Sequence, residues 1–280
     1  MVTLIQTTQE LVEKRTADRF DAGFVPTMGN LHQGHISLLK QALKDFPIVY
    51  FSIFVNPKQF GQNEDFALYP RTLENDINLI EQVAKDFPKS QVVVYAPKDP
   101  TEVFPEGMNH TISVLGITAD LEGQIRPGHF DGMATVVWRL FDLIKPRTAY
   151  FGLKDLQQYH VVKQMVKDLA LPIKIQGMPI IREDSGLALS SRNQYLTPEQ
   201  KAGSLILFNT LNEIKKMIIT GKDPRGFIQE LLNDPQWNYL ELRDTESFSK
   251  DITQSKNISI LAVYQMGKTR LLDNMQVEVQ

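Results

Sequence analysis

Two histidines three residues apart, His32 and His35, are the most informative local feature of the sequence. They lie in residues 26–35, which follow an apolar run and include Gly29 and Gly34. A glycine-containing turn from a strand into a helix offers unpaired backbone N–H groups and the positive end of the helix dipole. If the first helical turn includes both histidines, they share a face and can donate to neighbouring phosphate oxygens. The pattern predicts a phosphate-binding turn, which we favour over two capping or surface histidines.

Polar side chains also follow a second apolar run, residues 48–55. Asn56 and Gln59 come directly after it, at the end of a strand where ligand crevices of open α/β sheets lie. We expect them to orient polar groups of a substrate, although an ordinary turn stabilised by the Asn-Pro pair has equal standing. Asp76, further along, could be an ordinary residue on a helix face as easily as a magnesium ligand.

A third polar segment begins where the apolar residues 149–151 end. Lys154 can act as a point charge directed at phosphate. Asp155 has a simpler explanation, since a carboxylate is favoured in the first turn of a helix. Gln158 lies one turn further on and is expected to face the same crevice.

Residues 182–193 form a fourth segment rich in hydroxyl and guanidinium groups. Arg192 offers a planar fork for phosphate oxygens, and Ser190 and Ser191 add hydroxyl donors without adding charge. Such a group suits a triphosphate. A solvated capping segment would explain any two of these residues, but explains the whole set less well.

The elements that must position these segments alternate between strand-like and helix-like runs, which is typical of parallel strands joined by helical crossovers. The clearest strands are residues 24–26, 48–55, 92–95 and 149–151, whose continuous apolar character suits burial on both faces. Apolar side chains recur at helical spacing between them and are assigned to the core. They are Ile36, Leu39, Ala42 and Leu43, then Met133, Val136, Val137, Leu140, Phe141 and Ile144, then Val162, Met165, Val166 and Leu169.

The alternation weakens after Gly177, and we place a domain boundary there. Residues 197–200 form a capping box with proline at the first helical position, so a helix is expected to start there and to run through Ala202 to about Ile219. Short strands with a hairpin near Gly267 are expected from Trp237 onward. The predicted fold is α/β: a Rossmann-like doubly wound parallel sheet over residues 1–176 that binds the substrates, and a smaller α+β lid domain over residues 177–280.

Composition limits the classes of function. The 280 residues are 42% hydrophobic and 22% charged, and they include no cysteine, which excludes disulfides and thiolate metal sites and favours a reducing cytoplasm. Neither a leader-like run nor an apolar stretch of about 18 residues is present. The formal net charge of −3 gives no overall attraction for nucleic acid or for an anionic membrane. We therefore expect a small phosphorylated ligand.

Several other chemistries lack their sequence patterns. The chain has no Walker loop, no Gly-x-Ser-x-Gly elbow and no His-Glu-x-x-His helix. The remaining histidines, His110, His129 and His160, lack the spacing of metal ligands and are interpreted as structural, with His129 set apart by its place in the segment 126–130.

Taken together, the four segments resemble those of the pantothenate synthetase family, which belongs to the His-x-Gly-His nucleotidyltransferases. The resemblance covers residues 24–196 with the motifs in order. It implies that the protein joins pantoate to β-alanine at the expense of ATP through an acyl adenylate, with Mg²⁺ as the ATP counterion. It also suggests a homodimer.

Position by position, the resemblance implies that His35 is the proton donor and His32 its phosphate-binding companion. Gln59 and Gln158 would hold pantoate, and Gln59 would also contact β-alanine. The implied ATP contacts are Met28, Gly29, Asn30, Leu31, His32, Gln33, Gly34, His35, Gly152, Leu153, Lys154, Asp155, Ile181, Leu189, Ser190, Ser191 and Arg192. We expect the charge that grows on pyrophosphate to be met by the histidines, Lys154, Ser190, Ser191 and Arg192.

Two residues depart from the family pattern. Leu153 stands where Glu or Gln is usual, and Ser185 stands where Asp is common. Two alternatives stay open: another His-x-Gly-His enzyme, such as an adenylyltransferase or a truncated aminoacyl-tRNA synthetase, and a nucleotide-sensing or protein-binding module with a degenerate ATP site.

Overall fold

The computed structural model describes residues 1–18, 21–61, 66–107 and 109–279. The chain forms two compact units. The first comprises Met1–Leu153 and Gln157–Pro179, and the second comprises Lys154–Leu156 and Ile180–Gln280. The boundary predicted between residues 176 and 177 lies near the last change of unit, between Pro179 and Ile180.

The first unit is built on a six-stranded sheet in the order β1-β4-β3-β2-β5-β6, in which every neighbouring pair is parallel. The strands are β1 (Val2–Ile5), β2 (Gly23–Thr27), β3 (Ile48–Ile53), β4 (Gln91–Tyr95), β5 (Thr148–Gly152) and β6 (Lys174–Met178). The four strands expected from apolar runs are confirmed as β2, β3, β4 and β5. The predicted fold class is confirmed as well.

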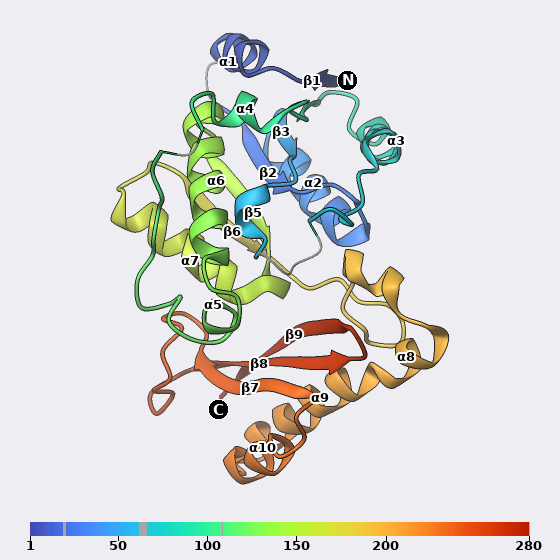
Figure 1. Ribbon diagram of the computed structural model, residues 1–280, viewed down its shortest axis with the longest axis vertical. Helices are drawn as coiled ribbons and strands as arrows, with labels where there is room; N and C mark the ends of the chain where they lie inside the picture. Colours follow the sequence, from blue (N-terminus) through green and yellow to red (C-terminus); the bar gives the residue numbers. More distant parts are fainter. Residues whose placement is uncertain (19–20, 62–65, 108, 280) are drawn as a thin grey trace. The chain divides into compact units, whose positions relative to one another are not determined.

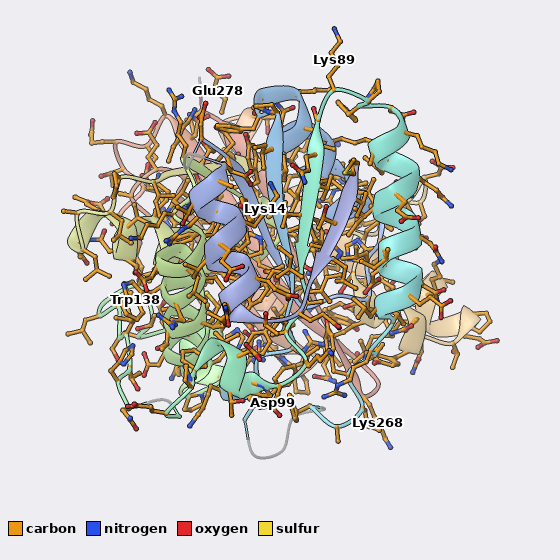
Figure 2. All side chains as sticks on the ribbon, turned by 90° about the horizontal axis from the view of Figure 1, so that it is seen from above. Lys14, Lys89, Asp99, Trp138, Lys268 and Glu278 are labelled. Atoms are coloured by element: carbon orange, nitrogen blue, oxygen red, sulfur yellow. The ribbon has the colours of Figure 1, made fainter. Side chains whose placement is uncertain are left out.

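Helices cover both faces of this sheet (Figure 1). They are α1 (Thr8–Ala17), α2 (Gln33–Asp45), α3 (Leu73–Lys85), α6 (His129–Ile144) and α7 (Leu156–Asp168), with the short α4 (Pro100–Val103) and α5 (Glu122–Ile125) in the connections. Successive residues of β2 face opposite sides: Phe24 packs with α1, α6 and α7, and Val25 packs with α2 and α3. Figure 2 shows α1 and α6 on one side of the strands and α3 on the other.

Three of the predicted polar segments leave the sheet from adjacent strands. The turn into α2 follows β2, a 3₁₀ turn η1 (Pro57–Gln59) follows β3, and a second 3₁₀ turn η2 (Leu153–Asp155) follows β5. Because β3, β2 and β5 are neighbours, these connections start from the same carboxyl edge. The chain turns to opposite sides of β2 there, which is the switch point where open α/β sheets bind ligands.

The second unit contains an antiparallel sheet in the order β7-β8-β9. Its elements are η3 (Ser191–Tyr195), α8 (Pro198–Gly203), α9 (Leu205–Ile219), α10 (Arg225–Leu231), β7 (Trp237–Asp244), β8 (Asn257–Met266) and β9 (Thr269–Glu278). Leu207, Leu211 and Ile214 of α9 pack on the sheet. The hairpin predicted near Gly267 is confirmed between β8 and β9, where Gly267 has φ +60°.

The single helix expected from the capping box through Ala202 to about Ile219 is only partly confirmed. Thr197 and Gln200 form the predicted capping box, but the helix ends at Gly203 and a new one starts at Leu205. Ser204 between them is fully buried, and its hydroxyl donates to the Lys201 carbonyl, which favours a break at this point. None of the helices in the described ranges combines the length and apolar character that crossing a membrane requires.

Candidate active site

Asp76 of α3 holds the turn that joins β2 to α2. Its Oδ2 accepts from the Asn30 backbone N–H at 3.0 Å, and its Oδ1 accepts from the Leu31 N–H at 2.8 Å. The Thr72 hydroxyl also lies within 3.2 Å of both oxygens. Only 2% of Asp76 is exposed, so this carboxylate serves the turn itself.

This arrangement argues against the predicted magnesium ligand, since both carboxylate oxygens of Asp76 are committed to protein donors. Among the described residues, no group of three or more His, Cys, Asp and Glu side chains is arranged to hold a metal ion. The turn also depends on backbone geometry. Gly29 has φ +82°, and a Cβ there would lie 3.0 Å from both Asp76 Oδ2 and Ile53 Cγ2.

His32 and His35 cap the start of α2 with their side chains. His32 is the N-cap, and its Nδ1 accepts from the Gly34 N–H at 3.1 Å, while His35 Nδ1 accepts from the His32 N–H at 3.3 Å. A backbone N–H can only donate, so each neutral ring carries its proton on Nε2. The ring centroids lie 4.1 Å apart. Two N–H donors are therefore paired at the positive end of the helix dipole.

Gly34 is required between the histidines for space. A Cβ at this position would lie 2.7 Å from His32 Cε1 and 2.9 Å from its Nδ1, closer than van der Waals contact allows. The spacing of the motif is thus explained by the packing of one ring over the first helical turn.

Gln59 lies beside this turn and is 8% exposed. Its Nε2 is 2.7 Å from the Met28 sulfur, so the β2 and β3 connections meet through these two side chains. Asn56 is 1% exposed, with its Nδ2 donating to Gln59 Oε1 at 3.3 Å and to the Gly132 carbonyl at 3.0 Å, and its Oδ1 accepting from the Lys58 N–H. The protein itself uses the Asn56 amide, so the substrate contact predicted for Asn56 is replaced by a supporting role.

His129, at the start of α6, fixes the other side of η1. Its Nδ1 lies 2.7 Å from the Gln59 carbonyl, and its Nε2 lies 3.1 Å from Arg126 Nη1. A carbonyl only accepts and a guanidinium only donates, so these contacts define a neutral ring with its proton on Nδ1. The interpretation of His129 as structural was therefore incomplete, because the residue positions Gln59.

The segment after β5 shows why residue 153 is apolar. A Cβ on Gly177 of β6 would lie 2.6 Å from Leu153 Cδ2, so the leucine packs closely against the sheet. Gln157 is 4% exposed and ties the connection before α5 to α7 through the Ile117 and Asp120 carbonyls. Gln158 follows it and is partly exposed, and its predicted contact with pantoate stays a prediction.

In the second unit, residues 181–189 form a tight hairpin that leads into residues 190–192, the Ser-Ser-Arg segment. Ile181 and Leu189, both predicted ATP contacts, face each other across this hairpin, with the Leu189 N–H donating to the Ile181 carbonyl at 2.9 Å. Ser190 is the N-cap of η3, and its hydroxyl accepts from the Arg192 N–H at 3.3 Å. The Ser190 hydroxyl thus holds the backbone of Arg192 in place.

Lys154 belongs to this second unit. Its side chain is 20% exposed, and its Nζ lies 3.6 Å from Asp155 Oδ1. The Lys154 carbonyl accepts from Asn274 Nδ2 at 2.8 Å. The structure thus groups Met28–His35 with Gln59 in one unit, and groups Lys154 with Ile181 and residues 189–192 in the other.

The sequence singled out Asp76 as a possible metal ligand and His129 by its segment, but the supporting roles in both groups were missed. Asp76 and His129 in the first unit, and Asp273 and Asn274 in the second, are buried polar residues that hold backbone or charged groups of the predicted site. They lie up to 120 positions from the groups they hold, so no local spacing pattern identifies them. The only signal in the sequence is their polarity within apolar surroundings.

A parallel sheet with a histidine-bearing turn at a helix N-terminus, set at the switch point, defines an α/β protein that binds a phosphorylated ligand. The match to a family model is more specific. The model described as pantoate–β-alanine ligase matches residues 1–276. The chain belongs to this family of enzymes, and the predicted resemblance is confirmed.

Relatives and solved structures agree with the match. The pantothenate synthetase of Acinetobacter baumannii is 41% identical over 280 residues, covering 98% of this chain and 97% of that protein. The Caldicellulosiruptor bescii pantothenate synthetase is 41% identical over 290 residues, covering 100% and 99%.

Among solved structures, pantothenate synthetase from Thermus thermophilus superimposes with a TM-score of 0.88 at 39% identity, covering 98% of both chains. The Francisella tularensis pantoate–β-alanine ligase, solved as a complex with β-γ ATP and β-alanine, superimposes with a TM-score of 0.76 at 33% identity. That comparison covers 98% of this chain and 97% of the Francisella chain.

Proposed function

We propose that the protein condenses pantoate with β-alanine in two steps, first forming pantoyl adenylate and pyrophosphate from pantoate and ATP, then pantothenate and AMP. The observation that carries this proposal is the pair His32 and His35, whose Nδ1 atoms are fixed by backbone N–H groups so that Nε2 carries the proton. Family membership supports the choice of substrates.

In the first step, a carboxylate oxygen of pantoate attacks the α-phosphorus, and the bond from that phosphorus to the β-bridging oxygen breaks. Pyrophosphate leaves with the electron pair, so negative charge grows on it. Proton donors and cations aimed at that charge lower the barrier, and one such donor is typically worth on the order of a hundredfold in rate. We assign this role to His35, His32, Lys154 and the Ser-Ser-Arg segment.

The ATP contacts assigned to the chain are Met28–His35, Gly152–Asp155, Ile181 and Leu189–Arg192. Within the first of these, the Asp76 carboxylate supports the turn by holding two consecutive backbone N–H groups. A preorganised turn does not need to rearrange during the reaction, which is the main source of electrostatic catalysis in such sites.

In the second step, the neutral amine of β-alanine attacks the carbonyl carbon of the adenylate. The carbon–oxygen bond to phosphate breaks, AMP leaves with the oxygen that came from pantoate, and the new amide nitrogen loses a proton. We assign Gln59 and Gln158 to pantoate and Gln59 also to β-alanine. Burial of Gln59 against Met28 supports this assignment, because the adenylate must be kept from water.

We propose Mg²⁺ as the counterion that ATP itself carries on its phosphate oxygens. Among the described residues, no three or more His, Cys, Asp and Glu side chains are grouped to hold a metal ion, and the Asp76 oxygens already accept from Asn30 and Leu31. No step is therefore assigned to protein-bound metal.

We also propose a cytoplasmic homodimer in which residues 177–280 act as a lid domain. Sedimentation equilibrium tests the dimer, and a particle with the mass of one chain would contradict it. The lid is tested by small-angle scattering with and without ATP analogue. A radius of gyration that does not change when the ATP analogue binds would contradict the lid role of residues 177–280.

The direct test of the function follows AMP release with ATP, pantoate and β-alanine, omitting each in turn. Pyrophosphate exchange into ATP should depend strictly on pantoate, whereas dependence on an amino acid would indicate a synthetase. His35→Ala should fold normally and lose on the order of a hundredfold or more in exchange rate. His110→Ala, which removes an exposed histidine, is the matched control. A near-wild-type rate for His35→Ala would overturn the assignment.

A further inference from the structure

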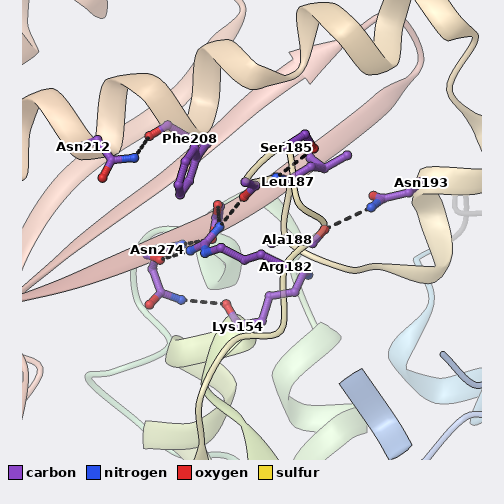
Figure 3. A network of polar contacts seen from close by, with 11 residues as sticks. Lys154, Arg182, Ser185, Leu187, Ala188, Asn193, Phe208, Asn212 and Asn274 are labelled. Atoms are coloured by element: carbon purple, nitrogen blue, oxygen red, sulfur yellow. Dashed lines mark hydrogen bonds and ion pairs between the residues drawn. The ribbon is translucent and has the colours of Figure 1, made fainter. Parts of the chain in front are cut away.

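Two consecutive residues of β9, Asp273 and Asn274, hold groups that come from distant parts of the second unit. Figure 3 shows the Asn274 side chain joined to Lys154. Arg182 donates to Asp273 through Nη1 at 2.6 Å and Nη2 at 2.9 Å, and Nη2 also donates to the Asn274 carbonyl at 3.0 Å. Nη1 donates to the Gly186 carbonyl at 3.0 Å. The guanidinium lies 5.0 Å from the centroid of the Phe208 ring. Arg182 is thus fixed on several sides.

The fixed guanidinium holds the hairpin that carries the Ser-Ser-Arg segment. The two strands of the hairpin are joined by a bridge between Arg182 and Ala188 and by the hydrogen bond between Leu189 and Ile181. Asn193 Nδ2 then donates to the Ala188 carbonyl at 3.0 Å. A continuous series of hydrogen bonds therefore runs from β9 through Arg182 to η3.

The tight turn of this hairpin depends on Gly186. Its φ is +97°, and a Cβ there would lie 2.2 Å from the Phe208 ring. The same ring packs against the Arg182 guanidinium. The hairpin is therefore clamped between α9 and β9, with little freedom to shift along either.

Asn274 makes the second connection. Its side chain is 2% exposed, and Nδ2 donates to the Lys154 carbonyl at 2.8 Å. Asn274 belongs to β9, an edge strand of its sheet. The backbone of Lys154 is held there, although residues on both sides of 154–156 belong to the first unit.

Charge separates the supporting groups from the groups directed at ligand. Asp273 is 2% exposed, and its carboxylate forms a bidentate pair with Arg182, so the guanidinium charge is balanced inside the protein. Burial raises the pKa of the Asp273 carboxyl, and the hydrogen bonds and charge of Arg182 oppose that rise. Arg182 is therefore committed to Asp273, whereas Lys154 and Arg192 are the cations that we assign to phosphate.

We propose that Asp273 and Asn274 are positioning residues for adenylation. Asp273 acts through Arg182 and the hairpin on the Ser-Ser-Arg segment, and Asn274 acts through the backbone of Lys154. One strand thereby sets the spacing of the two groups that meet the leaving pyrophosphate. This inference rests on the proposed function, since it assigns the supports of that same site.

The test separates the two half-reactions. Adenylation is measured as pantoate-dependent pyrophosphate exchange, and the second step is measured as pantothenate formation from supplied pantoyl adenylate and β-alanine. Asn274→Ala and Asp273→Asn should reduce exchange on the order of tenfold or more, because small displacements of positioned groups are costly. The second step should stay within about threefold of wild type, since pyrophosphate is absent from it.

Asn233→Ala and Asp251→Asn are matched controls at exposed positions of the same unit, and both half-reactions should be unchanged in them. A double-mutant cycle with Lys154→Ala tests the proposed connection. If Asn274 acts through Lys154, Asn274→Ala should add little to the loss already caused by Lys154→Ala. The cycle uses no change at Asp273, so it decides the role of Asn274 even if Asp273→Asn does not fold.

Parallel losses in both half-reactions, unchanged exchange in Asn274→Ala, or full additivity with Lys154→Ala would each overturn the proposal. Failure of the proposed function is a separate outcome, because the wild-type protein itself would then show no pantoate-dependent exchange.

Discussion

The turn that carries His32 depends on a single buried carboxylate, and Asp76→Asn tests this dependence with almost no change in volume. The ionised carboxylate accepts two backbone N–H bonds, at 2.8 and 3.0 Å. The amide keeps one acceptor and turns an NH₂ group toward the second N–H. Loss of one charge-assisted hydrogen bond in a buried site is worth about 2–3 kcal/mol.

That energy should appear mainly as displacement of the turn, because the groups that lose a full partner are backbone N–H groups of the turn itself. A difference of about 2–3 kcal/mol corresponds to a population change of roughly 30- to 150-fold. We therefore expect kcat/KM for ATP to fall by that factor in Asp76→Asn. The loss in Asp76→Ala should be larger, since both N–H groups lose their partner.

The assay is pyrophosphate exchange at varied ATP, repeated over a range of Mg²⁺ concentrations. If Asp76 supports the turn, the Mg²⁺ concentration for half-maximal rate stays unchanged in Asp76→Asn. Thr72→Val removes a weaker donor to the same carboxylate and should have a much smaller effect. Recovery of Asp76→Asn by high Mg²⁺ would refute this reasoning and restore the metal interpretation, and a wild-type rate at all concentrations would refute it as well.

Three further changes test other parts of the structure. Gly34→Ala should raise KM for ATP about tenfold or more with little loss of stability, because the alanine Cβ would lie 2.7 Å from the His32 ring and displace it. An unchanged KM would show that the His32 ring is not held in place. His129→Asn should keep most activity, since an amide nitrogen can replace Nδ1 as the donor to the Gln59 carbonyl. His129→Leu lacks a donor and should raise KM for pantoate. Equal effects of the two substitutions would contradict the role of His129 in positioning Gln59. Hydrogen bonds from the turn after β7 lower the pKa of Asp244 to about 2, so its stabilising effect is present above about pH 4 and is lost as pH falls through about 2. Asp244→Asn should accordingly unfold more easily than wild type at neutral pH in denaturant titrations, with a difference that narrows between about pH 4 and pH 2; a constant difference would contradict the assignment.

Sequence patterns predicted those strands and helices whose own residues form a clear apolar run or helical repeat. Residues 48–53 form a continuous apolar run because β3 is a central strand buried on both faces. The edge strands lack that signal. β1 has only four residues and is interrupted by Thr3, and β6 includes Gln176 and Gly177, so neither strand stands out as a long apolar run. Their pairing is decided by neighbours distant in the chain.

The residues of the active site likewise divide into those that local spacing identifies and those whose role depends on tertiary packing. His32, Gly34 and His35 were identified because a turn, a cap and a helix start are local features that fix their own spacing. Asn56 was assigned to substrate because its position at a strand end is correct, but burial turns its amide toward Gly132 of α6. Whether an amide faces a ligand or its own protein depends on tertiary packing, which spacing along the chain does not encode.

Asp273 and Asn274 show most clearly what the sequence alone does not predict. Arg182 lies 91 positions from Asp273, and Lys154 lies 120 positions from Asn274. Sequence inspection placed Arg182 among the guanidinium groups suited to a triphosphate, whereas the structure commits it to a buried carboxylate. Only the arrangement of β9 against the hairpin distinguishes a supporting arginine from one directed at phosphate.

Transfer of an oxygen atom from pantoate to AMP tests the adenylate mechanism most directly. Pantoate labelled with ¹⁸O in its carboxylate is converted with ATP and β-alanine, and the AMP is analysed by mass spectrometry. Attack of the carboxylate on the α-phosphorus requires that each AMP gain one labelled oxygen, and that pyrophosphate gain none. Unlabelled AMP, or label in inorganic phosphate together with ADP, would contradict adenylate formation.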